Sequence, residues 1–193
     1  MVEWCATQPW SSGKVGMIGE SYYGMIQWFV AAQNPPHLTC VAPYDAATDM
    51  FRHLAFKGGV YFTSFQNHWY SNTVRNRHLM DYPQRPPRAD YMSYDYLREQ
   101  ALHPTFDSFW RGRRADLSQV RVPVFSIGNW AGTTAHLLGN LQGFMQAQGP
   151  KKLLVNVGDP QLIFLEPHIE EQLVRWYDYW LKGIDIGVMD EPP

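Results

Sequence analysis

Several features that mark metal, nucleic-acid and membrane proteins are missing from this 193-residue sequence. It has only two cysteines, Cys5 and Cys40, too few for a disulfide framework or a cysteine metal site, so we expect buried free thiols. The net charge is −2 and no block of basic residues occurs, which argues against nucleic-acid binding. No apolar run approaches the roughly 20 residues that cross a bilayer, and the N-terminus lacks a signal-like segment.

The histidines are not spaced as a set of metal ligands either. His53, His68, His78 and His103 lie in one region of the chain, but their spacing is unlike that of metal ligands. We therefore expect no metal and no other cofactor, no nucleic-acid partner and no membrane partner. A cytoplasmic location is favoured, and the oligomeric state is left open.

The residues that are present indicate a globular α/β protein. Hydrophobic residues make up 45% of the chain and charged residues 18%, which is enough apolar material for a sizeable core. A short apolar run over residues 15–18, a helical pattern over 22–33 and a second apolar run over 38–42 predict a βαβ unit with parallel strands. Pro43 is expected to end the second strand, and residues 1–8 are expected to be the end of a helix.

The middle of the chain has a different character. Residues 48–119 are rich in aromatic residues and arginines, contain proline breaks and show no strand alternation. We predict an irregular helical insertion that caps the sheet, with Gly58-Gly59 as a break between helices.

Regular α/β order returns after the insertion. Strands are predicted over 122–127 and 152–157, and helices over 133–148 and 169–181, the last closed by Lys182-Gly183. About four strands make half of a typical open sheet, and such a half would leave one strand edge bare. We therefore expect a fragment of a longer protein that lacks the N-terminal half of its sheet.

One motif carries chemistry. The segment from Lys14 to Gly24, KVGMIGESYYG, runs from an apolar strand through Gly19-Glu20-Ser21 into a helical pattern. This is the layout of a nucleophile elbow, in which a strand-to-helix turn presents a serine hydroxyl at the sheet edge. Ser21 is thus the candidate nucleophile for acyl transfer, and it requires a base and an orienting acid.

These residues resemble the cocaine esterase and X-Pro dipeptidyl-peptidase group of α/β-hydrolases. As in that group, the second glycine of the elbow comes one position late, at Gly24. Further similar segments are EW and QPW before the elbow, FWR and VPV after the insertion, WLKG in the last helix, and DEPP at the end. The resemblance covers nearly all of residues 1–193, with 48–119 as the helical cap, and it places a jelly-roll domain beyond the last residue.

The resemblance implies a partial α/β-hydrolase fold, a serine nucleophile and no metal. It implies small esters, amides or X-Pro dipeptides as substrates. The backbone N–H of Tyr22 would be one oxyanion donor, and the other would come from a tyrosine upstream of Met1.

Two positions of the resemblance are occupied by residues that cannot act as acid or base. Ala131 stands where the group has its aspartate, and Leu162 stands where it has its histidine. The candidates that could replace them are His168 as the favoured base, His136 as a second base and Asp159 as an orienting acid. Two hypotheses follow: a serine hydrolase that uses Ser21, or a catalytically silent hydrolase-like fragment that binds or supports something else.

Overall fold

The computed structural model describes residues 1–75, 95–130, 133–158 and 166–191. Contacts divide the chain into two compact units. The first consists of Met1–Thr48 and Arg114–Pro193, and the second of Asp49–Arg113. The second unit is an insertion in the sequence of the first.

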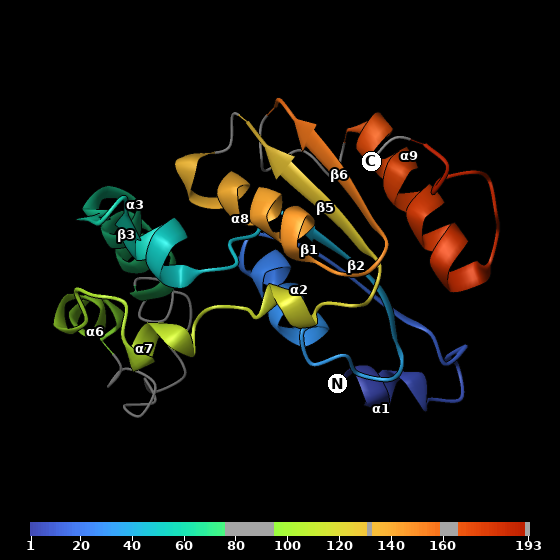
Figure 1. The fold of residues 1–193 in the computed structure, drawn as a ribbon, viewed down its shortest axis with the longest axis horizontal. Helices are drawn as coiled ribbons and strands as arrows, with labels where there is room; N and C mark the ends of the chain where they lie inside the picture. Colours follow the sequence, from blue (N-terminus) through green and yellow to red (C-terminus); the bar gives the residue numbers. More distant parts are fainter. Residues whose placement is uncertain (76–94, 131–132, 159–165, 192–193) are drawn as a thin grey trace, which may run out of the picture. The chain divides into compact units, whose positions relative to one another are not determined.

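A parallel sheet of four strands forms the first unit. The strands are β1 (Val15–Glu20), β2 (Leu38–Tyr44), β5 (Val124–Asn129) and β6 (Lys151–Asn156). They lie in the order β1-β2-β5-β6, and each neighbouring pair is parallel (Figure 1). The carboxyl ends of all four strands therefore meet at one edge, where α/β proteins hold their sites. The predicted α/β class and parallel βαβ unit are confirmed.

Helices cover both faces of this sheet. Helix α9 (Pro167–Tyr177) buries Ile169, Leu173 and Trp176 against side chains of β2 and β5. Helices α2 (Tyr22–Ala31) and α8 (Thr133–Gln146) pack closely on each other. A Cβ added at Gly143 of α8 would lie only 2.3 Å from the Trp28 ring of α2. Figure 1 shows α8 and α9 on opposite sides of the strands. Helix α1 (Val2–Ala6) precedes β1 and is shorter than expected.

Two predicted element ends differ from the structure. Strand β2 does not end before Pro43 but continues to Tyr44, because its paired residues with β5, Val41↔Val124 and Tyr44↔Ile127, lie on either side of the proline. The last helix ends its α-helical part at Tyr177 and continues as a π-helical turn, Asp178–Lys182. The glycine expected after that helix is confirmed, since Gly183 has φ of 74°.

The inserted unit contains short helices and one hairpin. Its helices are α3 (Thr63–Trp69), α6 (Tyr96–Leu102) and α7 (Ser108–Arg111), with π-helical turns at Met50–Ala55 and Tyr70–Arg75. Strands β3 (Phe56–Lys57) and β4 (Val60–Tyr61) pair antiparallel around Gly58-Gly59. The predicted break between helices lies where expected, between the Met50–Ala55 turn and α3, but the break is a hairpin whose tight turn is formed by two glycines with φ of 58° and 85°. That this insertion works as a cap stays a prediction.

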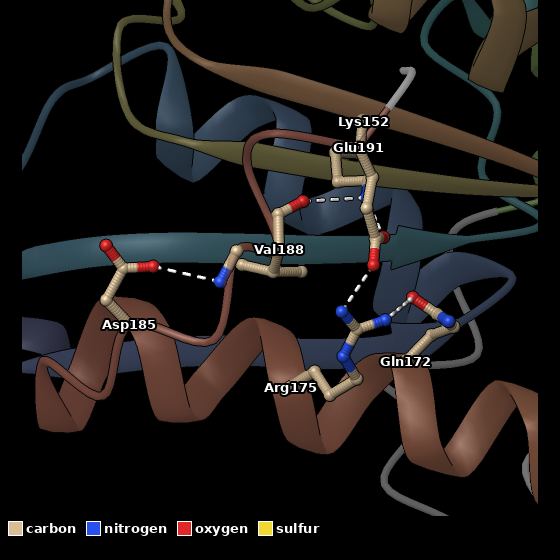
Figure 2. A network of polar contacts seen from close by, with 7 residues as sticks. Lys152, Gln172, Arg175, Asp185, Val188 and Glu191 are labelled. Atoms are coloured by element: carbon tan, nitrogen blue, oxygen red, sulfur yellow. Dashed lines mark hydrogen bonds and ion pairs between the residues drawn. The ribbon is translucent and has the colours of Figure 1, made fainter.

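Ion pairs and a hydrogen bond link the segment after α9 to the sheet. Lys152 of β6 donates to the Val188 carbonyl and to the Glu191 carboxylate, each at 2.8 Å (Figure 2). Arg175 of α9 bonds to the other carboxylate oxygen of Glu191. Lys152 is a buried cation, so Glu191 supplies the counter-charge that a buried charge needs.

Candidate functional site

The nucleophile elbow is present at the end of β1. Ser21 stands between β1 and α2 with φ of 55° and ψ of −122°, a sparsely populated region for a residue with a side chain. Its N–H donates to the Tyr44 carbonyl at 3.0 Å, and its carbonyl accepts from the Met25 N–H at 2.7 Å. The turn is thus held from both sides, as a serine presented at the sheet edge requires.

The late position of the glycine in the motif, at Gly24, has a steric cause. A Cβ on Gly24 would lie 2.6 Å from the Tyr44 carbonyl oxygen and 2.9 Å from the Ala46 Cβ. Tyr23, one residue earlier, is 62% exposed and can carry a large side chain. The close approach of α2 to the end of β2 therefore occurs three residues after Ser21, which is where the glycine is needed.

Ser21 has an imidazole beside it. Its Oγ lies 3.3 Å from Nε2 of His136, within hydrogen-bond reach. When the other ring nitrogen carries the proton, Nε2 can accept from the serine hydroxyl. His136 is half-buried at the end of the first turn of α8, the helix that follows β5. A serine hydroxyl beside an imidazole nitrogen is an arrangement in which a proton can pass from one to the other.

A buried amide fixes α8 against the end of β2. Asn140 Oδ1 accepts from the Ala46 N–H at 2.7 Å, and Nδ2 donates to the Pro43 carbonyl at 2.9 Å and to Ser126 Oγ at 3.0 Å. His136 lies one helical turn before Asn140, so the two share a face of α8. Because Ser21 is bonded to Tyr44 of the same strand end, Asn140 also fixes His136 relative to Ser21.

Asp45, the residue after β2, is a buried carboxylate. It is 1% exposed, has φ of 40°, and neither carboxylate oxygen has a hydrogen-bond partner among the residues that the structure describes. Burial, with the negative charge of Glu20 adding to it, raises the pKa of Asp45 to about 7. Asp45 is not among the site residues predicted from the sequence, although an aspartate directly after a central strand is a usable signal.

Tyr22 is the first residue of α2. The N–H groups of a first helical turn point out of the helix end, where a developing oxyanion can accept them. The Tyr22 and Tyr23 rings pack on each other with centroids 4.4 Å apart. This aromatic pair therefore borders the serine on the exposed side of the turn.

The other predicted partners are not brought to the serine by any described contact. His168 is exposed in the first turn of α9, and His136 is the histidine that reaches Ser21. Ala131, Asp159 and Leu162 lie outside the described residues.

The described histidines of the insertion have local partners. His53 accepts from the Asp49 N–H, His68 contacts Asn72, and His103 pairs with Asp107 at 2.6 Å. His78 lies outside the described residues. No group of three potential metal ligands occurs within the described part of the chain. In the same part, no helix has the length and apolar character needed to cross a membrane.

Solved structures share this fold. A CocE/NonD family hydrolase from Staphylococcus aureus superposes with a TM-score of 0.83 at 31% identity, over 99% of this chain and 33% of that one. An α-amino acid ester hydrolase superposes with a TM-score of 0.56 at 14% identity, over 93% of this chain and 36% of that one, which shows the fold alone.

Curated relatives agree in sequence. The cocaine esterase of a Rhodococcus species is 39% identical over 51 residues, which are 26% of this chain and 9% of that protein. A candidate Xaa-Pro dipeptidyl-peptidase of Streptomyces avermitilis is 27% identical over 195 aligned residues, covering 97% of this chain and 28% of that protein. The chain thus spans about a third or less of the length of such relatives.

The family model for X-Pro dipeptidyl-peptidase (S15 family) matches residues 1–159, which include Ser21, Asp45 and His136. This match covers most of the chain and agrees with the parallel sheet and the elbow. The chain therefore belongs to the X-Pro dipeptidyl-peptidase (S15) family.

Proposed function

We propose that this chain is a serine hydrolase that acts on small esters, amides or X-Pro dipeptides through an acyl-enzyme on Ser21. The observation that carries the proposal is the 3.3 Å contact between Ser21 Oγ and His136 Nε2 at the elbow. A nucleophile and a base in hydrogen-bond reach are the minimum that acyl transfer to serine needs. Our choice of base is His136 rather than His168, because His136 makes this contact.

The proposed reaction uses this geometry. Ser21 Oγ attacks the acyl carbon while His136 Nε2 takes the hydroxyl proton, and the carbonyl oxygen becomes an oxyanion facing the Tyr22 N–H. The protonated His136 then gives its proton to the leaving alcohol or amine, and the bond to that group breaks. A water molecule, deprotonated by His136, then attacks the acyl-enzyme. His136 returns this proton to Ser21 Oγ as the acyl–oxygen bond breaks, so the acid leaves and both residues are restored.

The substrate class rests on the family. Relatives carry the names cocaine esterase and Xaa-Pro dipeptidyl-peptidase, one an ester and the other a peptide activity. Both reactions pass through the same tetrahedral chemistry, so one serine site can serve either. The net charge of −2 and the absence of a basic block favour a small neutral substrate over a nucleic acid.

A fluorophosphonate probe tests the proposal, because it labels only an activated serine. We expect the wild-type chain to be labelled and Ser21→Ala to be blank. His136→Ala should lower the labelling rate at least ~10³-fold, since loss of the base in a serine hydrolase costs up to about 10⁶ in turnover. His168→Ala is the competing variant and should be labelled like the wild type.

The outcomes separate the hypotheses. Loss of labelling in His168→Ala with retention in His136→Ala would move the base to His168. A wild-type chain that stays unlabelled at millimolar probe would contradict the enzyme function. It would favour a catalytically silent hydrolase-like fragment, consistent with Ala131 and Leu162 at the family's acid and base positions.

A further inference from the structure

Asp45 is a buried acid that the proposed reaction does not yet use. It follows β2 directly, so it lies at the carboxyl edge of the sheet, the same edge that presents Ser21 after β1. It is 1% exposed, and both of its carboxylate oxygens are without a hydrogen-bond partner among the described residues. A buried carboxylate without partners is costly, so its presence calls for a compensating role.

Asp45 is tied to the nucleophile through its preceding residue. The Tyr44 carbonyl, which belongs to the peptide bond joining Tyr44 to Asp45, accepts the Ser21 N–H at 3.0 Å. The N–H of Asp45 donates to the Ile127 carbonyl of β5 at 2.9 Å. The Asp45 backbone is therefore held at a fixed place between the elbow and the neighbouring strand.

Asp45 is tied to the base through its following residue. The Ala46 N–H, on the peptide bond that joins Asp45 to Ala46, donates to Asn140 of α8 at 2.7 Å. One position earlier on α8, a Cβ at Gly139 would lie 2.3 Å from the Ala46 carbonyl oxygen, so the helix and this segment are in tight contact. His136 is one turn before these two residues on the same helix, so the segment that contains Asp45 packs against the helix that carries the base.

The charges around Asp45 fit a role near neutral pH. Burial raises the pKa of Asp45 to about 7, and the negative charge of Glu20 on β1 adds to this. The Asn129 backbone N–H and the Tyr44 hydroxyl act in the opposite direction and lower the pKa of Asp45 in part. A carboxyl poised in this way gains most from a positive charge that appears beside it.

We propose that Asp45 is the acidic positioning residue of this site, which balances the positive charge on His136 while Ser21 is acylated. This inference rests on the proposed function. It gives the order Ser21, Asp45, His136 along the chain, which is the triad order of α/β-hydrolases. The acid then follows β2 and the base follows β5. Each is one strand nearer to the elbow than the family's acid and base positions, which Ala131 and Leu162 occupy in this sequence.

The charge balance is simple. Proton transfer from Ser21 turns His136 into an imidazolium, and the ionised Asp45 carboxylate offsets that charge without taking the proton. Asp45 returns to its earlier environment when His136 gives the proton to the leaving group. No further reactant is needed.

The test compares rates of fluorophosphonate labelling of the 193-residue chain between pH 5 and pH 9 for wild type and Asp45→Asn. At pH 8 the variant should be labelled at least ~10-fold more slowly, and as much as about 10⁴-fold, the loss found when a triad acid is made an amide. The ratio of the two rates should approach 1 below pH 6, because the wild-type carboxyl with a pKa of about 7 is then protonated. A purely structural role would not give a ratio that depends on pH in this way.

Asp190→Asn is the matched control, since Asp190 is exposed in the C-terminal segment, and it should keep a ratio of 1 at every pH. Thermal unfolding at pH 8 checks folding, and the uncharged amide should unfold at the wild-type temperature or above. A rate ratio of 1 throughout, or a constant ratio above 1, overturns the role of Asp45 while labelling of wild type still supports Ser21 and His136. An unlabelled wild type contradicts the proposed function instead.

Discussion

Ser21 sits in a backbone conformation that costs on the order of 1–3 kcal/mol for a residue with a side chain, and its neighbours must hold it there. The motif predicted the place of this turn correctly, because a strand, Gly-x-Ser and a helix leave little choice. The role of Gly24 could not be predicted from the sequence, since it depends on how near the Tyr44 carbonyl comes. At the elbow the sequence therefore predicts which residue types occur, but it does not predict which atoms of the rest of the fold they contact.

Gly24→Ala should destabilise the chain and weaken the site together. The new Cβ would meet the Tyr44 carbonyl oxygen at 2.6 Å and the Gly19 carbonyl oxygen at 2.9 Å, and backbone atoms cannot move aside cheaply. We expect a net loss on the order of 1–3 kcal/mol of unfolding free energy, measured by urea denaturation. The helix propensity gained by alanine, about 1 kcal/mol, is not expected to offset it.

Gly112→Ala is the control for that change. Gly112 ends α7 with φ of −70°, and an added Cβ would meet nothing nearer than 3.9 Å. Its effect should stay within about 0.5 kcal/mol. Equal effects at the two glycines would show that the close approach of α2 to β2 is not what selects glycine at position 24.

Helix α8 shows how far a pattern of residues can locate a site. Its extent was predicted to within a few residues, and His136 was among the candidate bases. The choice between His136 and His168 depends on which helix faces the elbow, and local spacing carries no such information. The hairpin of β3 and β4 was missed for a related reason, since two-residue strands are too short to show alternation.

Asn140→Ala should detach α8 from the end of β2. The change leaves the buried Ala46 N–H and Pro43 carbonyl without their side-chain partner, and each unsatisfied group costs about 1–3 kcal/mol. We expect a loss of roughly 2–5 kcal/mol in urea denaturation and faster hydrogen exchange at the Ala46 amide.

Gln146→Ala on the exposed end of the same helix is the matched change. It should alter the unfolding free energy by less than about 0.5 kcal/mol. Slow exchange at Ala46 in Asn140→Ala would mean that another group holds this segment, and the amide would lose its assigned role.

In the sheet-bearing unit, ion pairs link the segment after α9 to the edge strand β6 and to α9. Lys152 of the edge strand β6, Arg175 of α9 and Glu191 come from three segments that lie far apart in sequence (Figure 2). The sequence predicted the strand and the helix but not this link, because a buried lysine in a strand gives no indication of its partner. Such long-range pairings are set by the packing of the finished fold.

Stability at acid pH should depend on Glu191. Arg175, and then Lys152, lower the pKa of this carboxyl from 4.5 to about 2 in the folded chain. The folded pKa is below the unfolded one, so the contribution of the carboxylate is fully present above about pH 5 and is lost as the pH falls toward 2. Glu191→Gln should therefore unfold at a lower temperature than the wild type at pH 7, and the two melting temperatures should converge between pH 4.5 and 2.

Glu171→Gln, an exposed change on α9, should follow the wild type throughout. A difference between wild type and Glu191→Gln that stays constant down to pH 2 would show that the glutamate acts by packing and not by its charge.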